Sequence, residues 1–259
     1  MSGGAGAQRP FIEFRGAGYA LRDGHVLLKE LHLSVASGES LVLLGRSGAG
    51  KTTALKLVNR LLEPTSGQVL IEGRATTEWD PIALRRRTGY VIQEAGLFPH
   101  YTVEENVALV PQLENWPGSR MRQRVDELLA LVGLDPGGFR DRYPHELSGG
   151  QRQRVGVARA LAADPPVLLM DEPFGALDPL TRAEIRQEFQ ALQKRLRKTV
   201  ILVTHDTSEA LLLADRIGLM EAGELRGLYS PREFLSSSEP VAAAYVSQLR
   251  ALENFEGRP

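Results

Sequence analysis

The chain of 259 residues has no cysteine, and no apolar run approaches the roughly 20 residues needed to cross a bilayer. Without cysteine, disulfides and thiolate metal sites are excluded, and the composition suits a reducing cytoplasm. The first ten residues, MSGGAGAQRP, lack the apolar core of a signal peptide and predict a flexible polar tail. We therefore expect a soluble protein that reaches a membrane only through a partner.

An excess of charge of either sign is missing as well. Lys and Arg number 31 and Asp and Glu number 32, which gives a net charge of −1. This near-balance gives no support for nucleic acid as the main partner. The length allows one substantial core with a satellite subdomain, and no internal repeat is found.

Short apolar strands alternate with helices along most of the chain. The runs LVLLG (41–45), VLLMDE (167–172) and TVILVTH (199–205) are typical of strands buried on both faces. Their alternation with helices predicts an α/β fold with a mostly parallel sheet, right-handed crossovers and flanking helices. The other expected elements are a helix over 53–62, an antiparallel strand over 68–73, a β segment over 89–93, a charged helix over 180–197, and a last strand over 216–220 before a turn and a short helical tail.

The middle of the chain, from about 94 to 163, predicts a helical lobe on this sheet. Its segment MRQRVDELLALVGL places Val125, Leu128, Leu129 and Val132 on one helical face, ended by Gly133. The expected divisions are a tail over 1–10, a main domain over 11–235 with an antiparallel β subdomain and the inserted lobe, and a short helical tail over 236–259.

The segment GRSGAGKTT matches the phosphate-loop pattern G-x-x-x-x-G-K-[ST], after a buried strand and before a helix. Glycines let the backbone wrap around phosphate oxygens, and successive N–H groups form an anion nest. Lys51 can reach the β- and γ-phosphates, and the Thr52 hydroxyl can ligate Mg²⁺. The alternative is an ordinary glycine-rich turn. The candidate ATP-binding residues are Gly45, Arg46, Ser47, Gly48, Ala49, Gly50, Lys51, Thr52 and Thr53.

Polar side chains stand at the ends of three further apolar strands, where ligands of open α/β sheets bind. Asp171 is a candidate for orienting Mg²⁺, and Glu172 for polarising the attacking water as general base. Gln93 can sense Mg²⁺ or that water through its amide, and His205 can hydrogen-bond the γ-phosphate. Taken singly, each of these could equally be a solvated strand end; their agreement favours a catalytic site.

A second glycine pair begins a helix in HELSGGQRQRV. One reading is a capping box, with Ser148 as N-cap and Gln151 reaching back to its amide. A capping box needs no glycine, however, and Gly149 and Gly150 suggest that a ligand or another backbone approaches closely. A helix N-terminus with Ser148 offers a second anion site. A two-fold dimer would use both sites, each ATP lying between one phosphate loop and the other chain's Ser148 helix.

In this order, GRSGAGKTT, Gln93, LSGGQ, VLLMDEP, ALD and His205 resemble the nucleotide-binding subunit of ABC transporters, over about residues 11–235. The resemblance implies a P-loop NTPase core, an ATPase acting as a head-to-tail homodimer, and membrane-embedded permease partners. It also implies a peripheral position on the cytoplasmic face of the membrane and an indirect link to a solute-binding protein. Tyr19 matches an aromatic that stacks on adenine, the alternative being a surface strand residue, and Asp178 matches a loop that contacts the opposite site.

The segments from 89 to 111 and from 145 to 182 are similar to importers of glycine betaine, choline and related osmoprotectants. Amino-acid or lipid transport remains open, because the transported substrate does not touch the ATPase. Leu97, Phe98 and Tyr101 are expected either in the core of the helical lobe or in a surface cleft for a permease helix. Two other classes are alternatives: an ABC ATPase of translation or DNA repair, and a nucleotide-binding scaffold without turnover.

Overall fold

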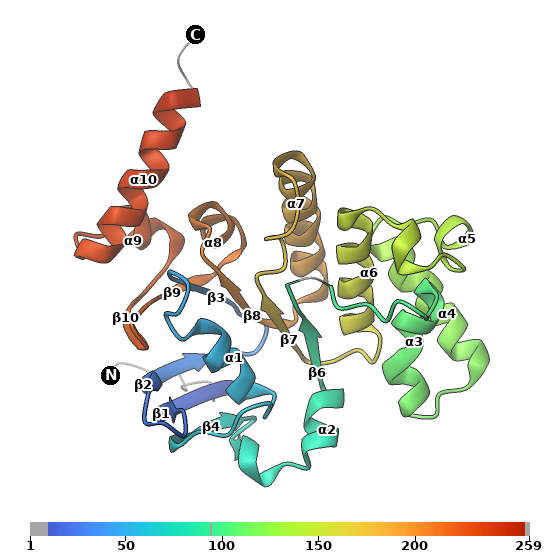
Figure 1. Cartoon of the computed structure of the whole chain (residues 1–259), viewed down its shortest axis with the longest axis horizontal. Helices are drawn as coiled ribbons and strands as arrows, with labels where there is room; N and C mark the ends of the chain where they lie inside the picture. Colours follow the sequence, from blue (N-terminus) through green and yellow to red (C-terminus); the bar gives the residue numbers. More distant parts are fainter. Residues whose placement is uncertain (1–9, 94, 257–259) are drawn as a thin grey trace, which may run out of the picture.

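Two β-sheets with helices between and around them make up the structure (Figure 1). The computed structural model describes residues 10–93 and 95–256. The smaller sheet is antiparallel, in the spatial order β2-β1-β4-β5, and consists of β1 (Ile12–Ala20), β2 (Val26–Val35), β4 (Ser66–Ile71) and β5 (Arg74–Ala75). The larger sheet, in the order β10-β9-β3-β8-β7-β6, consists of β3 (Ser40–Leu44), β6 (Thr88–Val91), β7 (Val167–Asp171), β8 (Thr199–Thr204), β9 (Arg216–Glu221) and β10 (Glu224–Tyr229).

The central strands of the larger sheet are buried on both faces because each face packs on a different core. In β3, Leu41 and Leu43 join a core with the smaller sheet, whereas Val42 and Leu44 join a second core with the helices on the far side. Side chains of a strand alternate between faces, so a strand covered on both sides needs a continuous apolar run. The expected mostly parallel sheet is confirmed: β9, β3, β8, β7 and β6 pair in parallel.

The first helix, α1 (Lys51–Val58), packs between the two sheets. It begins two residues earlier and ends four residues earlier than the expected 53–62. The early end follows from Asn59, whose side chain accepts a hydrogen bond from the Leu61 amide, and from Arg60, whose φ of +53° leaves the helical region. The short helix α2 (Pro81–Arg86) then leads into β6.

The helices of the middle segment gather at one side of the larger sheet, as Figure 1 shows in green. Val125, Leu128, Leu129 and Val132 are buried as expected, and Gly133, with a φ of +72°, follows the end of its helix. Residues 1–9 of the expected tail and residue 94, where the lobe was expected to begin, lie outside the described residues. The four helices are α3 (Val103–Leu113), α4 (Gly118–Leu131), α5 (Pro136–Phe139) and α6 (Gly149–Leu161).

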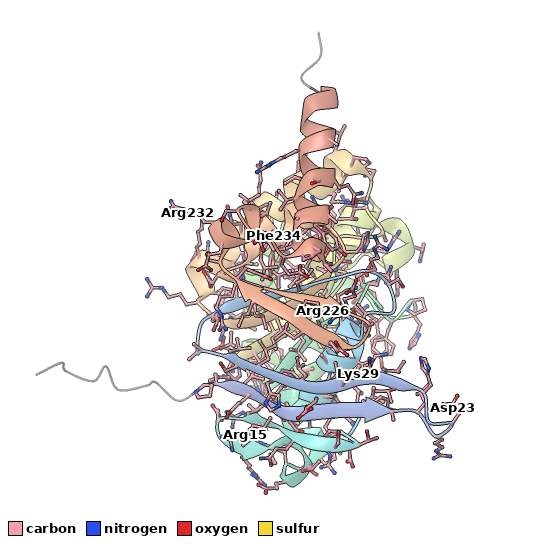
Figure 2. The ribbon with its side chains drawn as sticks, turned by 90° about the vertical axis from the view of Figure 1, so that its left-hand side faces the viewer. Arg15, Asp23, Lys29, Arg226, Arg232 and Phe234 are labelled. Carbon is pink, nitrogen blue, oxygen red and sulfur yellow. The ribbon has the colours of Figure 1, made fainter. Side chains whose placement is uncertain are left out.

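The expectation that 216–220 forms the last strand was wrong. Strand β10 follows the turn and pairs antiparallel with β9, its sequence ELRGLY giving no clear alternation. Gly223, with a φ of +82°, makes the tight turn, and Lys29 of β2 pairs with Glu224 at 3.0 Å across the two sheets. Figure 2 shows Lys29 on the strand beside β10. Hairpin geometry and this neighbouring sheet edge, rather than β10's own pattern, form the strand.

The two helices after β10 pack on the core. Phe234 of α9 (Pro231–Leu235) is fully buried beneath its helix and meets Tyr229 edge to face, with ring centroids 5.8 Å apart (Figure 2). The 17-residue helix α10 (Pro240–Glu256) buries Ala242 and Val246 in the same core. Beyond that contact, α10 projects away from the body in both views (Figures 1 and 2).

Candidate active site

The parallel register brings the ends of four strands to one edge of the larger sheet. Leu44 of β3 lies opposite Thr204 of β8, and Asp171 of β7 lies opposite Val203. The residues that follow these strand ends therefore share one edge, the carboxyl edge at which α/β sheets bind ligands. They are Gly45, Gln93, Glu172 and His205.

The loop from Gly45 to Gly50 is enclosed closely by backbone on two sides. A Cβ at Gly45 would lie 2.3 Å from the Met220 carbonyl oxygen, and one at Gly50 would lie 2.6 Å from that of Leu27. Gly50 also has a φ of +93° and is the N-cap of α1, so glycine is required there both for space and for conformation. The N-terminus of α1 thus opens into a cavity of about 140 Å³, which the loop and Glu172 line.

Lys51 lies buried inside this loop and holds it in shape. Its Nζ donates hydrogen bonds to the carbonyl oxygens of Gly45, at 2.7 Å, and Arg46, at 2.9 Å. Burial lowers the pKa of Lys51 below its ordinary value, although the nearby charges of Glu172 and Asp171 act in the opposite direction. The ammonium group therefore stands between the loop and the carboxylates, where an anionic ligand would be attracted.

Oxygen ligands suited to Mg²⁺ meet beside the loop. The Thr52 hydroxyl donates to Asp171 Oδ1 at 2.8 Å, and the Tyr90 hydroxyl donates to Oδ2 at 3.4 Å. Burial, reinforced by the charge of Asp171, raises the pKa of Tyr90 and keeps it a donor. Mg²⁺ binds through one or two protein oxygens together with phosphate and water. Thr52 and Asp171 fit that requirement, and among the described residues no group of three or more acidic or histidine side chains could hold a metal on its own.

Glu172 and His205 form a pair at the mouth of this site. The Glu172 backbone has a φ of +44° and is fixed by its N–H, which donates to the Val203 carbonyl at 3.0 Å. Its Oε2 lies 3.2 Å from His205 Nδ1, and the His205 side chain is 60% exposed. Gln93 follows β6 in an exposed turn, and its amide nitrogen lies near Gly175, beside Glu172. The structure thus brings together the three expected catalytic side chains.

Sequence reasoning missed a buried charged network behind His205. Arg186 of α7 (Pro179–Leu196) donates to Glu209 at 2.5 and 3.1 Å and to Asp206 at 2.5 Å. Glu209, in α8 (Thr207–Leu213), also accepts from the Thr204 hydroxyl at 2.5 Å. These contacts fix both sides of His205. Only the spacing His205-Asp-x-x-Glu209 is visible in the sequence, and it does not identify Arg186 as the partner.

Opposite pKa shifts reflect this arrangement. Burial raises the pKa of Glu209, despite its hydrogen bond from Thr204 and the charge of Arg186. Burial also opposes ionisation of Asp206, but Arg186 and the backbone amides of α8 outweigh it, so its pKa is lowered. The arginine therefore holds two carboxylates, one of them almost completely buried.

Ser148 caps α6 in the reciprocal capping box that the sequence allowed. Its Oγ accepts from the Gln151 amide at 3.2 Å, and Gln151 Oε1 accepts from the Ser148 amide at 2.9 Å. At Gly150 a Cβ would lie 2.7 Å from Thr181 Cγ2, so α7 of the same chain provides the close approach expected there from a ligand or a backbone. At Gly149 only ordinary contacts surround that position, and the residue is exposed. Ser148 to Gln151 lie outside both cavities along the phosphate loop.

Two residues implied by the resemblance lie apart from these contacts. Tyr19 of β1 is paired with Leu28 and packs, partly buried, on the core between the sheets. The residue of this sheet that lines the phosphate-loop cavity is Leu27. Asp178 is the exposed N-cap of α7, and its hydrogen bonds from Thr181 lower its pKa. Stacking of Tyr19 on adenine and contact of Asp178 with a second site stay predictions.

The loop after Gln93 is part core and part surface. Leu97 packs partly buried on the core, as expected if this loop belongs to the core of the helical lobe. Phe98 is 42% exposed, and its ring centroid lies 5.4 Å from that of Tyr101. Asn106 is fully buried and holds the loop in place. Its side chain accepts a hydrogen bond from the Phe98 amide at 2.8 Å and donates to the carbonyl oxygens of Phe98, Tyr101 and Thr102. An internal side chain thus holds an exposed aromatic in place.

A phosphate loop at a helix start, with an adjoining hydroxyl–carboxylate pair and a strand-end glutamate, defines a nucleotide-binding protein of the P-loop class. The sequence model of the ABC transporter family matches residues 28–175 of this chain, and the chain therefore belongs to that family.

Bacterial transport proteins are among its relatives. It is 52% identical to the glycine betaine/carnitine/choline transport ATP-binding protein OpuCA of Bacillus subtilis, over 83% of this chain and 56% of that protein. It is 51% identical to the choline transport ATP-binding protein OpuBA of the same organism, over 90% and 61%. It is 54% identical to the glycine betaine uptake system ATP-binding protein YehX of Escherichia coli, over 76% and 64%. The chain therefore spans about three fifths of the length of these relatives.

Solved structures share the fold. CbiO1 from Clostridium perfringens, described as part of the ABC transporter complex cbiONQ, is 29% identical and aligns with a TM-score of 0.81 over 95% of this chain and 99% of that one. The dimeric cassette MJ0796, bound to ADP and Pi in a post-hydrolysis state, is 35% identical and aligns with a TM-score of 0.76 over 85% and 99%. The expected fold, with an antiparallel β subdomain and a helical subdomain, is confirmed.

The first prediction concerns the Arg186 network. Arg186→Met should destabilise the protein by about 3–5 kcal/mol, because it leaves the buried carboxylate of Glu209 without its opposite charge. Arg186→Met combined with Glu209→Gln should recover much of that loss, since neither charge remains. Urea unfolding measures both effects. Lys198→Met, which removes an ion pair to the exposed Asp164, is the control and should cost about 0–1 kcal/mol.

The pH dependence of the same variants has a definite sign. A carboxyl whose pKa is raised on folding stabilises the native state at low pH, and this contribution is lost as the pH rises above its ordinary value of 4.5. Removing Arg186 raises the pKa of Glu209 further, so Arg186→Met should lose more stability at pH 8 than at pH 5. An equal loss of stability at pH 5 and pH 8 would show that the pKa of Glu209 does not depend on Arg186.

Proposed function

We propose that this chain is the ATP-binding subunit of an ABC importer and hydrolyses Mg²⁺-ATP as a head-to-tail homodimer. The observation that carries the proposal is the separation of two half-sites. Lys51, Asp171, Glu172 and His205 meet at one sheet edge, whereas Ser148 caps an exposed helix start outside the cavities of that edge. A second copy related by a two-fold axis brings its Ser148 helix to the first copy's phosphate loop.

Each residue at the sheet edge then has a chemical role. Backbone N–H groups of the loop and Lys51 bind the phosphates, and Thr52 with Asp171 would hold Mg²⁺, which neutralises developing phosphate charge. Glu172 accepts the proton of the attacking water. His205, oriented by its contact with Glu172, hydrogen-bonds the γ-phosphate, and Gln93 senses the water or the metal from its turn.

The second copy supplies the rest of the site. Ser148 and the amides of Gly149, Gly150 and Gln151 face the γ-phosphate across the dimer. Gly149 supports this role, because its position is open to solvent and none of the described residues comes close enough to require glycine there. Asp178 approaches the opposite site, and Tyr19 stacks on adenine.

Membrane-embedded permease subunits are the proposed partners of the exposed aromatic loop, with a solute-binding protein linked indirectly through them. Within the described part of the chain, no helix combines the length and apolarity that a transmembrane segment needs. Phe98 and Tyr101, held by Asn106, offer an apolar surface for a short permease helix. The subunit would lie on the cytoplasmic face of the membrane. The relatives point to a quaternary amine such as glycine betaine or choline as the transported solute.

The second prediction tests the chemistry. Glu172→Gln should keep ATP binding, because the phosphate loop and the Thr52–Asp171 pair are unchanged. It should lower the hydrolysis rate by about 10²–10⁴, the usual cost of losing a general base. Phosphate release and nucleotide titration separate the two effects, and Lys51→Ala is the contrasting variant, which should weaken binding itself. Wild-type hydrolysis by Glu172→Gln would show that another group acts as the base.

The third prediction tests the two-chain site. One chain carries Lys51→Ala and the other Ser148→Arg, each alone unable to form a sound site. Their mixed dimer has one doubly damaged site and one site that pairs an intact Lys51 with an intact Ser148. Mixing should restore ATP-driven dimerisation, measured by sedimentation. If both half-sites belonged to one chain, every site would carry a lesion and mixing would restore nothing.

The fourth prediction tests the partner surface. Phe98→Asp should leave folding and ATP binding of the isolated subunit intact, because the ring is exposed, while preventing co-purification with the permease. Leu113→Asp is the control, since Leu113 is 52% exposed at the other end of α3. A Phe98→Asp subunit that unfolds, or one that still co-purifies, would contradict this assignment.

A further inference from the structure

A second and larger cavity adjoins the nucleotide site on the side of the C-terminal helix. Its volume is about 980 Å³, and it contains Glu172 and His205 together with the outer side of the phosphate loop, Arg46 to Ala49. The opposite wall is α10, through Pro240, Val241, Ala244, Tyr245 and Gln248. The helix that projects from the body is therefore also a wall of the catalytic region.

This wall is apolar and fixed in position. Ala242 and Val246 bury an adjacent face of α10 in the core, and Val241 and Tyr245 pack partly buried against the same core, so the side chains on the cavity face have a defined orientation. Val241, Ala244 and Tyr245 give that face its apolar character, and Met220 adds to it from β9. The open volume beside them suits an apolar side chain from outside the chain.

Leu180 is the most exposed large apolar side chain among the described residues. It is 79% exposed, more than the 59% of Ile82, the next large hydrophobic residue. A single exposed leucine is ordinary, but Leu180 lies in the first turn of α7, two residues after Asp178. The loop before it, from Gly175 to Asp178, is the segment proposed to cross to the second copy.

We infer that Leu180 of one copy packs against Val241, Ala244 and Tyr245 of the other copy when the nucleotide sites close. This inference rests on the proposed head-to-tail dimer. The cavity is continuous with that interface, because it shares Glu172 and His205 with the site that the second copy covers. Two-fold symmetry makes the contact twice, once on each side. Helix α10 is then part of the dimer interface.

The dimer affinity provides the first test. In a Glu172→Gln background, which is expected to retain bound ATP, Leu180→Asp should weaken ATP-driven dimerisation roughly 10²–10⁴-fold, because the symmetric dimer loses two buried leucines, each worth about 10–100-fold. Ala244→Asp should do the same from the other side of the contact, while nucleotide binding to the separate subunits stays unchanged. The control is Ile82→Asp, at the next most exposed large hydrophobic position, on α2, and it should have no effect. Sedimentation equilibrium measures all of these variants.

Cross-linking provides the second test, and the absence of native cysteine makes it unambiguous. Copies carrying Leu180→Cys and Ala244→Cys, with different tags, should be joined by a short bismaleimide in the presence of ATP. Arg250→Cys, exposed on the opposite side of α10 from the cavity lining, should not be joined to Leu180→Cys.

The outcomes separate this inference from the proposed function. Dimers that form normally with Leu180→Asp and give no Leu180–Ala244 cross-link would overturn the contact while leaving the head-to-tail dimer intact. Absence of any ATP-driven dimer in the Glu172→Gln background itself would overturn the proposed dimer, and the contact with it. A weakened dimer together with the selective cross-link would support both.

Discussion

The parallel pairing of β8 between β3 and β7 is the constraint on which the site depends. It sets the ends of three strands level, so that the phosphate loop, Glu172 and His205 all begin at the same edge. The Glu172 amide extends that pairing by one more hydrogen bond, to Val203, which directs the carboxylate away from an ordinary strand path. A shift of one residue in the register would separate these groups.

Charge balance then shapes the site around Lys51. The ammonium group is buried among backbone carbonyls, with Asp171 and Glu172 on the far side, so its burial is compensated without direct ion pairing. The same loop carbonyls define its geometry through contacts within the chain itself. Preformed donors of this kind stabilise phosphate charge without reorganisation, which is how electrostatic catalysis is most effective.

Local motifs could be predicted from the sequence, and features made by distant contacts could not. The phosphate loop, the doubly buried strands and the capping box of Ser148 depend on neighbouring residues and their spacing, and all are present. Strand β10 depends on its pairing with β9 and on the neighbouring edge of β2. The early end of α1 is different, because it follows from a local signal, the Asn59 side chain, that the expected helix over 53–62 overlooked. Arg186 could not be found because its partners, Asp206 and Glu209, come from a later helix.

Helix α7 connects what the sequence motifs leave separate. Its first turn carries Asp178 and Leu180 on the surface, and Arg182 donates back to the Leu177 carbonyl at 2.9 Å. One turn further, Arg186 holds Asp206, which follows His205, and Glu209, which in turn accepts from Thr204 before His205. Thr181 of the same turn also excludes a side chain at Gly150, so α7 sets the packing of the Ser148 helix. A helix moves as a rigid element, so a displacement at the first turn of α7 also acts on His205 and on the Ser148 helix. The residues on the proposed dimer surface and those that position the catalytic histidine therefore belong to one structural unit.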